Sequence, residues 1–210
     1  MSTTDTAAAA GPQPFTLPRK PHYVTLAADC DFFALFQKIE RHFDTCYMLE
    51  SLGEDSHMAR HSIIGFDPEY TLYANGTTLT IENRDGDAKH YQSDNPYELL
   101  RSLIPQNIIS RKYAGGLSGY LGYDAMQYFE PSLTLKASDD FDTFRFGLYK
   151  DGLILDKMTG EVTYFYYDNS RYEFLQTLID ADDEPAGPLH ITALGDTMSK
   201  AEHAEAVAKV

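Results

Sequence analysis

The 210-residue sequence contains no tryptophan, two cysteines and only 17 lysine and arginine residues. Cys30 and Cys46 do not form a C-x-x-C pair, and two cysteines cannot build the disulfide framework of a secreted scaffold, so we expect a reducing, cytoplasmic location. The 32 acidic residues give a formal net charge of -15, which repels phosphate backbones and anionic lipid surfaces. Nucleic acid and membranes are therefore not expected as partners.

Long hydrophobic runs are missing as well. No segment approaches the roughly 18 uncharged residues of a membrane span, and the N-terminal stretch lacks the apolar core of a secretion signal. The composition is nevertheless that of a globular protein, with 43% hydrophobic residues, 15 tyrosines and 12 phenylalanines. These aromatic residues favour β-strands, and the length suits one fairly large domain or one domain and the start of another.

Composition and patterning divide the chain into four parts. Residues 1–21 are rich in Ala, Thr, Ser and Pro without periodicity, and we expect a flexible tail there. Residues 22–180 carry the patterns of a folded domain, and the acidic residues 181–198 resemble a linker. Residues 199–210 open with the capping-box pattern S-x-x-E and show no helix termination signal. We therefore expect the natural protein to continue into a further domain.

Alternating apolar residues predict a series of antiparallel strands. The predicted strands cover 22–27, 45–50, 61–66, 70–74, 77–83, 144–149, 152–158 and 161–167. Turn signals separate them, including Asn75–Gly76, Asp151–Gly152 and Thr159–Gly160. The last two turns predict that the final three strands pair with one another in sequence.

Three apolar stripes at helical spacing predict helices inside the same domain. Each stripe follows a polar N-terminal cap: Asp29 or Asp31 before residues 32–43, Asn95 before a helix that stops at Pro105, and Ser170 with Glu173 before a third helix. Together with the strands they predict an α+β fold.

Several patterns that resemble functional motifs lack an essential feature. The glycines between Gly115 and Gly122 have neither phosphate-loop nor dinucleotide spacing, and they favour close backbone packing in a strand. His57 and His61 lack the glutamate of a metalloprotease motif, and the acidic run at Asp139 lacks the spacing of a calcium loop. No catalytic residue and no metal ligand is assigned within this chain.

Two segments resemble a known family. The strings "YMLES" and "RHSIIGFDP", followed by "GGLSGYLGYDAMQYFEP", are similar in order and spacing to the N-terminal region of anthranilate synthase component I and its relative aminodeoxychorismate synthase component I. The resemblance extends over roughly 23–210. It implies two orthogonally packed antiparallel β-sheets flanked by helices.

The resemblance also implies an activity for the full-length protein. Such a protein is a lyase that converts chorismate and ammonia to anthranilate and pyruvate in tryptophan biosynthesis, with Mg²⁺ bound in a C-terminal domain. A glutamine amidotransferase subunit, component II, supplies the ammonia. The catalytic and metal-binding residues are then expected beyond Val210, and this chain alone is expected to be inactive.

The family's "LLES" element binds L-tryptophan as a feedback inhibitor, and the matching residues are Met48, Leu49, Glu50 and Ser51. His61 occupies a position that holds Tyr or Lys in many members. A carboxylate such as that of Glu50 can pair with the α-ammonium group of an amino acid. The alternative is that Glu50 and Ser51 simply end a strand and face water.

Three other functions remain open at the sequence level. The chain could belong to an aminodeoxychorismate synthase component I of the folate pathway, to a stand-alone small-molecule binding module, or to a structural interaction domain. We also expect exposed apolar side chains such as Tyr120, Tyr123 and Phe129 to lie near a junction with a further domain. The chain alone would then self-associate.

Overall fold

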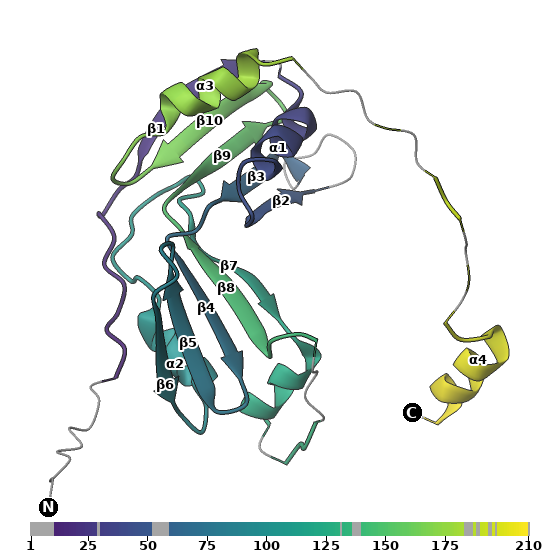
Figure 1. Cartoon of the computed structure of the whole chain (residues 1–210). Helices are drawn as coiled ribbons and strands as arrows, with labels where there is room; N and C mark the ends of the chain where they lie inside the picture. The colour runs from purple at the N-terminus through teal and green to yellow at the C-terminus, as the bar shows by residue number, and fades with distance from the viewer. Residues whose placement is uncertain are drawn as a thin grey trace, which may run out of the picture.

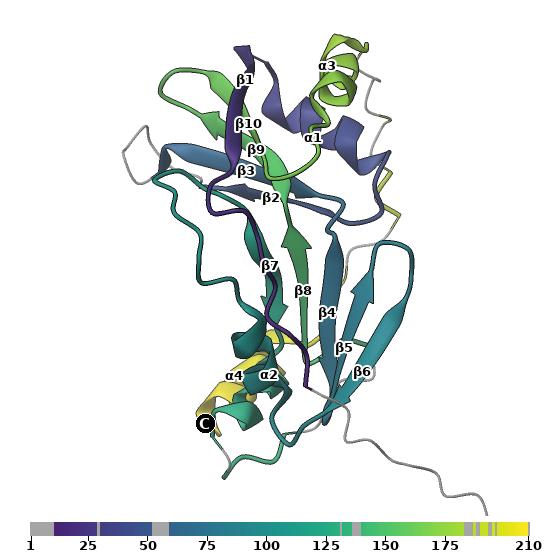
Figure 2. The same ribbon diagram turned by 90° about the vertical axis from the view of Figure 1, so that its left-hand side faces the viewer.

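The computed structural model describes residues 11–28, 30–51, 59–130, 132–135, 140–182, 187, 190–192, 195 and 197–209. They form two five-stranded sheets whose strand pairs are all antiparallel, with helices on the outside (Figure 1). Strands of the two sheets run in crossing directions, as β2 and β3 against β4 and β8 show in Figure 2. The predicted α+β fold of two crossing antiparallel sheets is confirmed.

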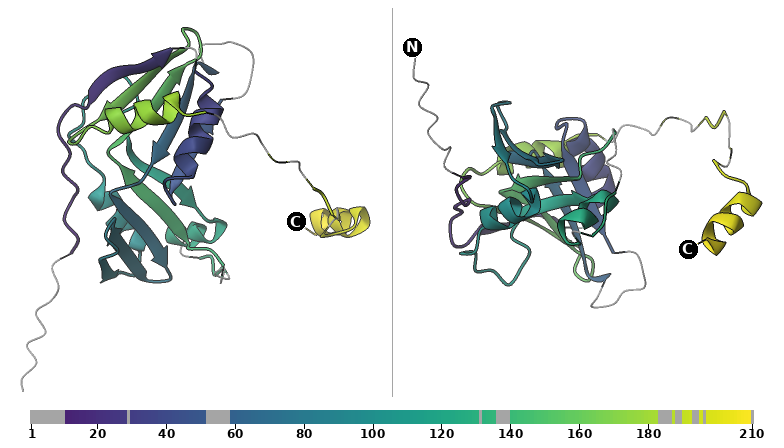
Figure 3. Two further views of the ribbon diagram at one scale, coloured as in Figure 1. Left: turned by 45° about the horizontal axis from the view of Figure 1, so that its top comes forward. Right: turned by 90° about the horizontal axis from the view of Figure 1, so that it is seen from below.

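The first sheet, sheet A, has the order β1-β10-β9-β3-β2. Its strands are β1 (His22–Ala28), β2 (Cys46–Glu50), β3 (His61–Phe66), β9 (Asp151–Asp156) and β10 (Glu161–Tyr166). Helices α1 (Phe32–Glu40) and α3 (Tyr172–Asp180) lie side by side on one face of it (Figure 3). Their apolar stripes form one buried cluster with the sheet, which includes Leu35, Ile39, Ile64, Leu153, Tyr164, Leu175 and Leu178.

The second sheet, sheet B, has the order β6-β5-β4-β8-β7. Its strands are β4 (Tyr70–Asn75), β5 (Thr78–Asn83), β6 (Ala88–Gln92), β7 (Gly116–Leu121) and β8 (Phe144–Tyr149). Helix α2 (Pro96–Leu103) packs on this sheet through Leu100 and Leu103, and the N-terminal segment adds Leu17 to the same cluster. A 3-10 helix, η2 (Tyr123–Tyr128), follows β7.

Two connections carry the chain directly from one sheet to the other. Strand β3 passes into β4, and β8 passes into β9 with only Lys150 between them. Asp151 and Gly152 therefore lie inside β9, opposite Tyr166 and Phe165 of β10. The predicted turn at Asp151–Gly152 is wrong, because β8 pairs with β4 and β7 while β9 pairs with β3 and β10. The predicted turn before Gly160 is present between β9 and β10.

The caps of the helices agree with the sequence in three of four cases. Asp31 caps α1, Asn95 caps α2, and Ser199 forms a complete capping box at the start of α4 (Lys200–Ala208). Asp29, the other candidate cap, lies outside the described residues. The capping box predicted from Ser170 is wrong, because Arg171 is the N-cap of α3 and makes no side-chain cap hydrogen bond.

Helix α1 ends at Glu40, before the predicted Phe43. The Phe43 ring instead packs on Phe66 at the end of β3, with 5.3 Å between the ring centroids. Helix α4 stands apart from both sheets, and none of its described side chains is buried (Figure 3). No helix in the described part of the chain has the length and apolar character to cross a membrane.

Candidate functional site

The end of β2 and the beginning of β3 pair at the edge of sheet A. Glu50 lies opposite Ser62 in the register of the two strands. The Lys157 ammonium group, which follows β9, lies 3.3 Å from Glu50 Oε1 and donates a 2.7 Å hydrogen bond to the Ser51 carbonyl oxygen. The backbone and the carboxylate at the end of β2 therefore both contact one cation from the end of β9, two strands away in the sheet.

The predicted tryptophan-binding residues lie on both faces of this edge. Successive side chains of a strand alternate between faces, so Met48 and Glu50 share the face that carries the helices. Met48 packs against the helix-covered cluster. Leu49, which is 52% exposed, and His61 lie on the opposite face, where each of them lines a cavity. Ser51 is exposed just beyond the strand.

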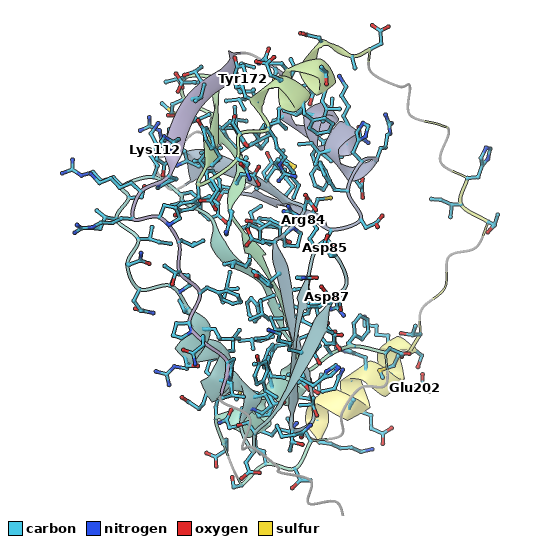
Figure 4. All side chains as sticks on the ribbon, turned by 60° about the vertical axis from the view of Figure 1, so that its left-hand side comes forward. Arg84, Asp85, Asp87, Lys112, Tyr172 and Glu202 are labelled. Atoms are coloured by element: carbon cyan, nitrogen blue, oxygen red, sulfur yellow. The ribbon has the colours of Figure 1, made fainter. Side chains whose placement is uncertain are left out.

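One of these cavities has a volume of about 410 Å³ and a charged rim. We call it the basic cavity; its charged and titratable lining residues are Arg60, His61, Arg111, Lys112, Tyr113, Asp156 and Glu161. Its floor is one row of cross-strand neighbours, Ile63 of β3, Ile154 of β9 and Thr163 of β10. The loop between α2 and β7 supplies Arg111 and Lys112, and Figure 4 shows Lys112 beside β1.

The second cavity has a volume of about 360 Å³ and lies where β2 faces β7 and β8. We call it the apolar cavity; it is lined in part by Tyr47, Leu49, Tyr120 and Tyr149, with glycine backbone from β7 and β8. The rings of Tyr47 and Tyr149 meet edge to face, with 4.8 Å between their centroids. Such a surface suits a flat, largely apolar group.

A pair of hydrogen-bonded tyrosines separates the two cavities. The hydroxyl groups of Tyr47, from the apolar cavity, and Tyr113, from the basic cavity, share a short hydrogen bond. Burial raises the pKa of both hydroxyl groups above the usual tyrosine value, and for Tyr113 the neighbouring Tyr47 adds to the shift. Both side chains therefore stay neutral, so that one always donates to the other.

Within the basic cavity, Arg60 and Asp156 form an ion pair. The Arg60 Nε atom lies 3.0 Å from both carboxylate oxygens of Asp156. This hydrogen bonding lowers the pKa of Asp156 and raises that of Arg60, so both groups remain charged near neutral pH. The pair fixes the position of Arg60 beside His61 at the rim.

The sequence did not indicate the contribution of the loop between α2 and β7. Arg111, Lys112 and Tyr113 lie some 60 residues from Glu50, and only the folded chain brings that loop onto sheet A. The two hydrogen bonds of the Tyr23 hydroxyl group anchor it, one with Ser110 Oγ at 2.6 Å and one to the Tyr113 carbonyl oxygen at 3.0 Å. No sequence motif predicts that residues 111–113 lie on sheet A.

The histidine pair and the acidic run noted in the sequence do not form a metal site among the described residues. His57 and Asp139 lie outside the described residues. Asp142, from the same acidic run as Asp139, is engaged by Arg145 at 2.7 Å and Asn75 at 2.6 Å. Among the described residues, no three His, Cys, Asp or Glu side chains gather as a metal ion would require.

Comparison with known proteins identifies relatives over most of the chain. No family model matches. Anthranilate synthase component 1 of Leptospira biflexa is 42% identical over 166 residues, which are 78% of this chain and 35% of that protein. The protein of the same name from Methanothermobacter thermautotrophicus is 32% identical over 168 residues, which are 80% of this chain and 35% of that protein.

A solved structure is similar as well. The crystal structure of anthranilate synthase component I from Streptococcus pneumoniae matches with a TM-score of 0.41 and 18% identity, over 62% of this chain and 30% of that one. The chain thus spans about a third of the length of the relatives that it matches. Because the sequence matches cover about four fifths of the chain, it belongs to the family of anthranilate synthase component 1.

Proposed function

We propose that this chain is the N-terminal, tryptophan-binding regulatory part of an anthranilate synthase component I. The full-length protein would convert chorismate and ammonia, obtained from glutamine, to anthranilate and pyruvate. The observation that carries this proposal is the 42% identity over 166 residues to a relative of that name. None of the matches reported above bears the name of an aminodeoxychorismate synthase, and we keep that enzyme as an outcome of the test.

The end of β2 offers suitable chemistry for an amino acid. The Glu50 carboxylate is exposed and paired with a single cation, Lys157, so an α-ammonium group could share or replace that partner. Leu49 borders the apolar cavity on the opposite face of β2 from Glu50, and its tyrosine walls suit an indole ring, so a ligand that uses both would bind around the free edge of this strand. His61 and Ser51 lie at the same edge and could hydrogen-bond the ligand's remaining polar groups.

Inhibition would require coupling between this edge and a catalytic site elsewhere in the protein. Tryptophan can lower activity only if it binds one conformation of the enzyme better than another. We place the catalytic residues and the Mg²⁺ ligands beyond Val210, and we assign no surface of this chain to the contact with the glutamine amidotransferase subunit. The proposal therefore assigns no catalytic step to the side chains of this chain.

The first test uses the full-length protein with chorismate, Mg²⁺ and an ammonium salt. We expect the fluorescence of anthranilate to appear and to fall as L-tryptophan is added. Consumption of chorismate without anthranilate would replace the proposal with aminodeoxychorismate synthase. No consumption of chorismate would reject both enzymes and favour a stand-alone binding module.

The second test measures the binding site on the chain itself. Because the sequence contains no tryptophan, the indole fluorescence of added L-tryptophan can be followed without indole background from the protein, with excitation beyond the absorption of its 15 tyrosines. Glu50→Gln should weaken binding by at least about 10-fold, the equivalent of about 1.4 kcal/mol for one charge-assisted hydrogen bond. Glu98→Gln is the matched control, because Glu98 is an exposed acid of α2 whose ion pair is with Arg101 on the same helix.

Equal affinities in the wild-type chain and the Glu50→Gln variant would reject the assignment of Glu50. In the full-length enzyme, substitution of Glu50 or Ser51 should relieve inhibition while turnover persists. Simultaneous loss of turnover and inhibition would contradict a regulatory role for this edge.

A further inference from the structure

The basic cavity concentrates positive charge in a strongly acidic protein. The chain carries a net charge of -15, yet two arginines, a lysine and a histidine line this one cavity. Asp156 neutralises Arg60. Arg111 and Lys112 then face one remaining carboxylate of the lining, that of Glu161, which accepts a 3.1 Å hydrogen bond from Thr163. The lining therefore has a surplus of positive charge.

Arg111 is the least engaged of these cations. Within the described ranges its guanidinium group has no hydrogen bond, ion pair or ring contact, although five N–H groups are available. Lys112 has one weak neighbour, since its ammonium nitrogen lies 5.7 Å from the centroid of the Tyr23 ring. Their hydrogen-bonding capacity is therefore free for a ligand.

The backbone that carries both cations is held in place. Ser110 Oγ accepts a hydrogen bond from the Lys112 amide at 3.1 Å and donates to the Lys112 carbonyl oxygen at 2.9 Å. Tyr23 of β1 bonds to Ser110 and to the Tyr113 carbonyl group on either side of them. Anchors on both sides reduce the entropy that the loop would lose when a ligand binds.

The floor of the cavity is apolar beneath this charged rim. Ile63 and Ile154 are neighbours across β3 and β9, and the volume of about 410 Å³ lies in the range typical of small-molecule sites. A hydrated inorganic ion would leave this floor uncovered. A ligand with both an oxyanion and a carbon skeleton would use the rim and the floor together.

We propose that the basic cavity binds a small organic carboxylate, with its oxygens on Arg111 and Lys112 and its carbon skeleton on Ile63 and Ile154. The basic cavity shares His61 with the proposed tryptophan contacts but not Glu50 or Ser51, neither of which lines it. The inference does not depend on the proposed function, because it uses none of the chemistry of tryptophan recognition at β2.

The test is a calorimetric titration of the full 210-residue chain with sodium succinate at constant ionic strength. We expect saturable binding that the double variant Arg111→Gln/Lys112→Gln weakens by at least about 10-fold, because two charge-assisted contacts are lost. The matched control is Arg101→Gln/Lys89→Gln, which removes the same charge from α2 and β6 and should leave the affinity unchanged. Circular dichroism of each variant verifies that the fold is retained.

Competition with inorganic phosphate separates the two common classes of oxyanion. Phosphate that displaces succinate only weakly supports a carboxylate site with an apolar floor. Phosphate that binds as tightly as succinate would overturn the carboxylate assignment. Heat that does not saturate, or equal weakening in the control variant, would overturn the site itself.

Discussion

Ser62 of β3, the strand between β2 and β9, has a buried hydroxyl group without a hydrogen-bond partner in the described structure. The residue is fully buried, and an unsatisfied hydroxyl group costs about 1–3 kcal/mol of folding free energy. Ser62→Ala should therefore stabilise the chain by about 1 kcal/mol and raise its Tm. Thermal unfolding followed by circular dichroism measures this effect.

Ser102→Ala is the control for this substitution. Ser102 is exposed on α2, and its hydroxyl group already donates to the Leu99 carbonyl oxygen at 2.7 Å. That variant should change Tm little. A lower Tm for Ser62→Ala than for the control would show that the Ser62 hydroxyl group is satisfied in solution.

The contribution of Asp156, at the rim of the basic cavity, to folding stability depends on pH. Its hydrogen bonds from Arg60 lower its pKa below the ordinary value of 3.8, so the folded state binds this proton more weakly than the unfolded state. The stabilisation is complete above that ordinary value and is lost as the pH falls through the folded-state pKa. Asp156→Asn should consequently flatten the decline of Tm between about pH 5 and pH 2.

The comparison for Asp156→Asn is Asp85→Asn, which replaces an exposed carboxylate in the turn after β5. The slope of Tm against pH should stay closer to the wild-type slope in that variant. Identical slopes in wild type and Asp156→Asn would show that the pair with Arg60 does not contribute to folding.

At the scale of the elements, one arginine contacts both connections that lead from one sheet to the other. The Arg171 guanidinium group lies 2.7 Å from carboxylate oxygens of both Asp151 and Asp67, and it stacks over the Phe66 ring at 4.4 Å. Asp67 has a left-handed backbone with φ of 49°, directly after β3. Arg171 therefore joins the connection β3–β4 to the connection β8–β9.

Arg171→Met should destabilise the chain by about 3–5 kcal/mol, because the mostly buried Asp151 carboxylate loses its cation and keeps only the hydrogen bond from Tyr164, while Asp67 keeps its ion pair with Arg84. Arg171→Lys should recover only part of this loss, since an ammonium group cannot reproduce the two-pronged geometry. Urea unfolding measures both variants, with Arg101→Met on the exposed face of α2 as the control. A loss below about 1 kcal/mol in Arg171→Met would mean that packing alone holds the junction.

The glycine at position 119 of β7 allows this strand to pack closely against the backbone of β8. A Cβ atom on Gly119 would lie 2.0 Å from the Arg145 carbonyl oxygen of β8, whereas a Cβ atom on Gly187 would meet nothing within 4 Å. Gly119→Ala should cost about 1–3 kcal/mol, because β7 must move away from β8. Urea unfolding of Gly119→Ala and Gly187→Ala measures the contrast; equal midpoints would contradict the close packing.

The sequence predicted correctly those elements that depend on interactions between residues close together along the chain. The caps of α1, α2 and α4 depend on neighbours within three residues, and the sequence located them. Asp151–Gly152 has the composition of a turn, but its partners in β3 and β10 are distant along the chain and hold it in a strand. Pairing over such distances overrides local preference.

The same distinction applies to the candidate sites. The meeting of Glu50 with the start of β3 follows from two strands that are adjacent along the chain, and the family resemblance named residues on both of them. The basic cavity requires a loop from beyond α2 to reach β1, through contacts of Tyr23 that span 87 and 90 residues. No periodic pattern or turn signal encodes such a contact, and Arg111 and Lys112 were missed for that reason.

At the scale of the whole molecule, exposed apolar side chains are concentrated along the segment from β7 to the start of β8. Exposed large residues follow one another along β7, η2 and the approach to β8: Tyr120, Leu121, Tyr123, Met126, Phe129 and Phe141. Tyr123 is 85% exposed and Phe141 69% exposed. A concentration of this kind marks an interaction surface, while the net charge of -15 opposes association of identical chains.

We therefore expect the chain to self-associate in a salt-dependent manner. Raising the ionic strength from about 0.01 M to 0.15 M shortens the screening length from about 30 Å to 8 Å, which weakens the repulsion but not the apolar contact. Sedimentation velocity should show a coefficient that rises with protein concentration, and more steeply at the higher salt. Tyr123→Ser/Phe141→Ser should abolish the rise, whereas Val207→Ser on the exposed helix α4 should not. A single monomeric species at both salt concentrations would show that this surface is too small or too mobile to pair with itself.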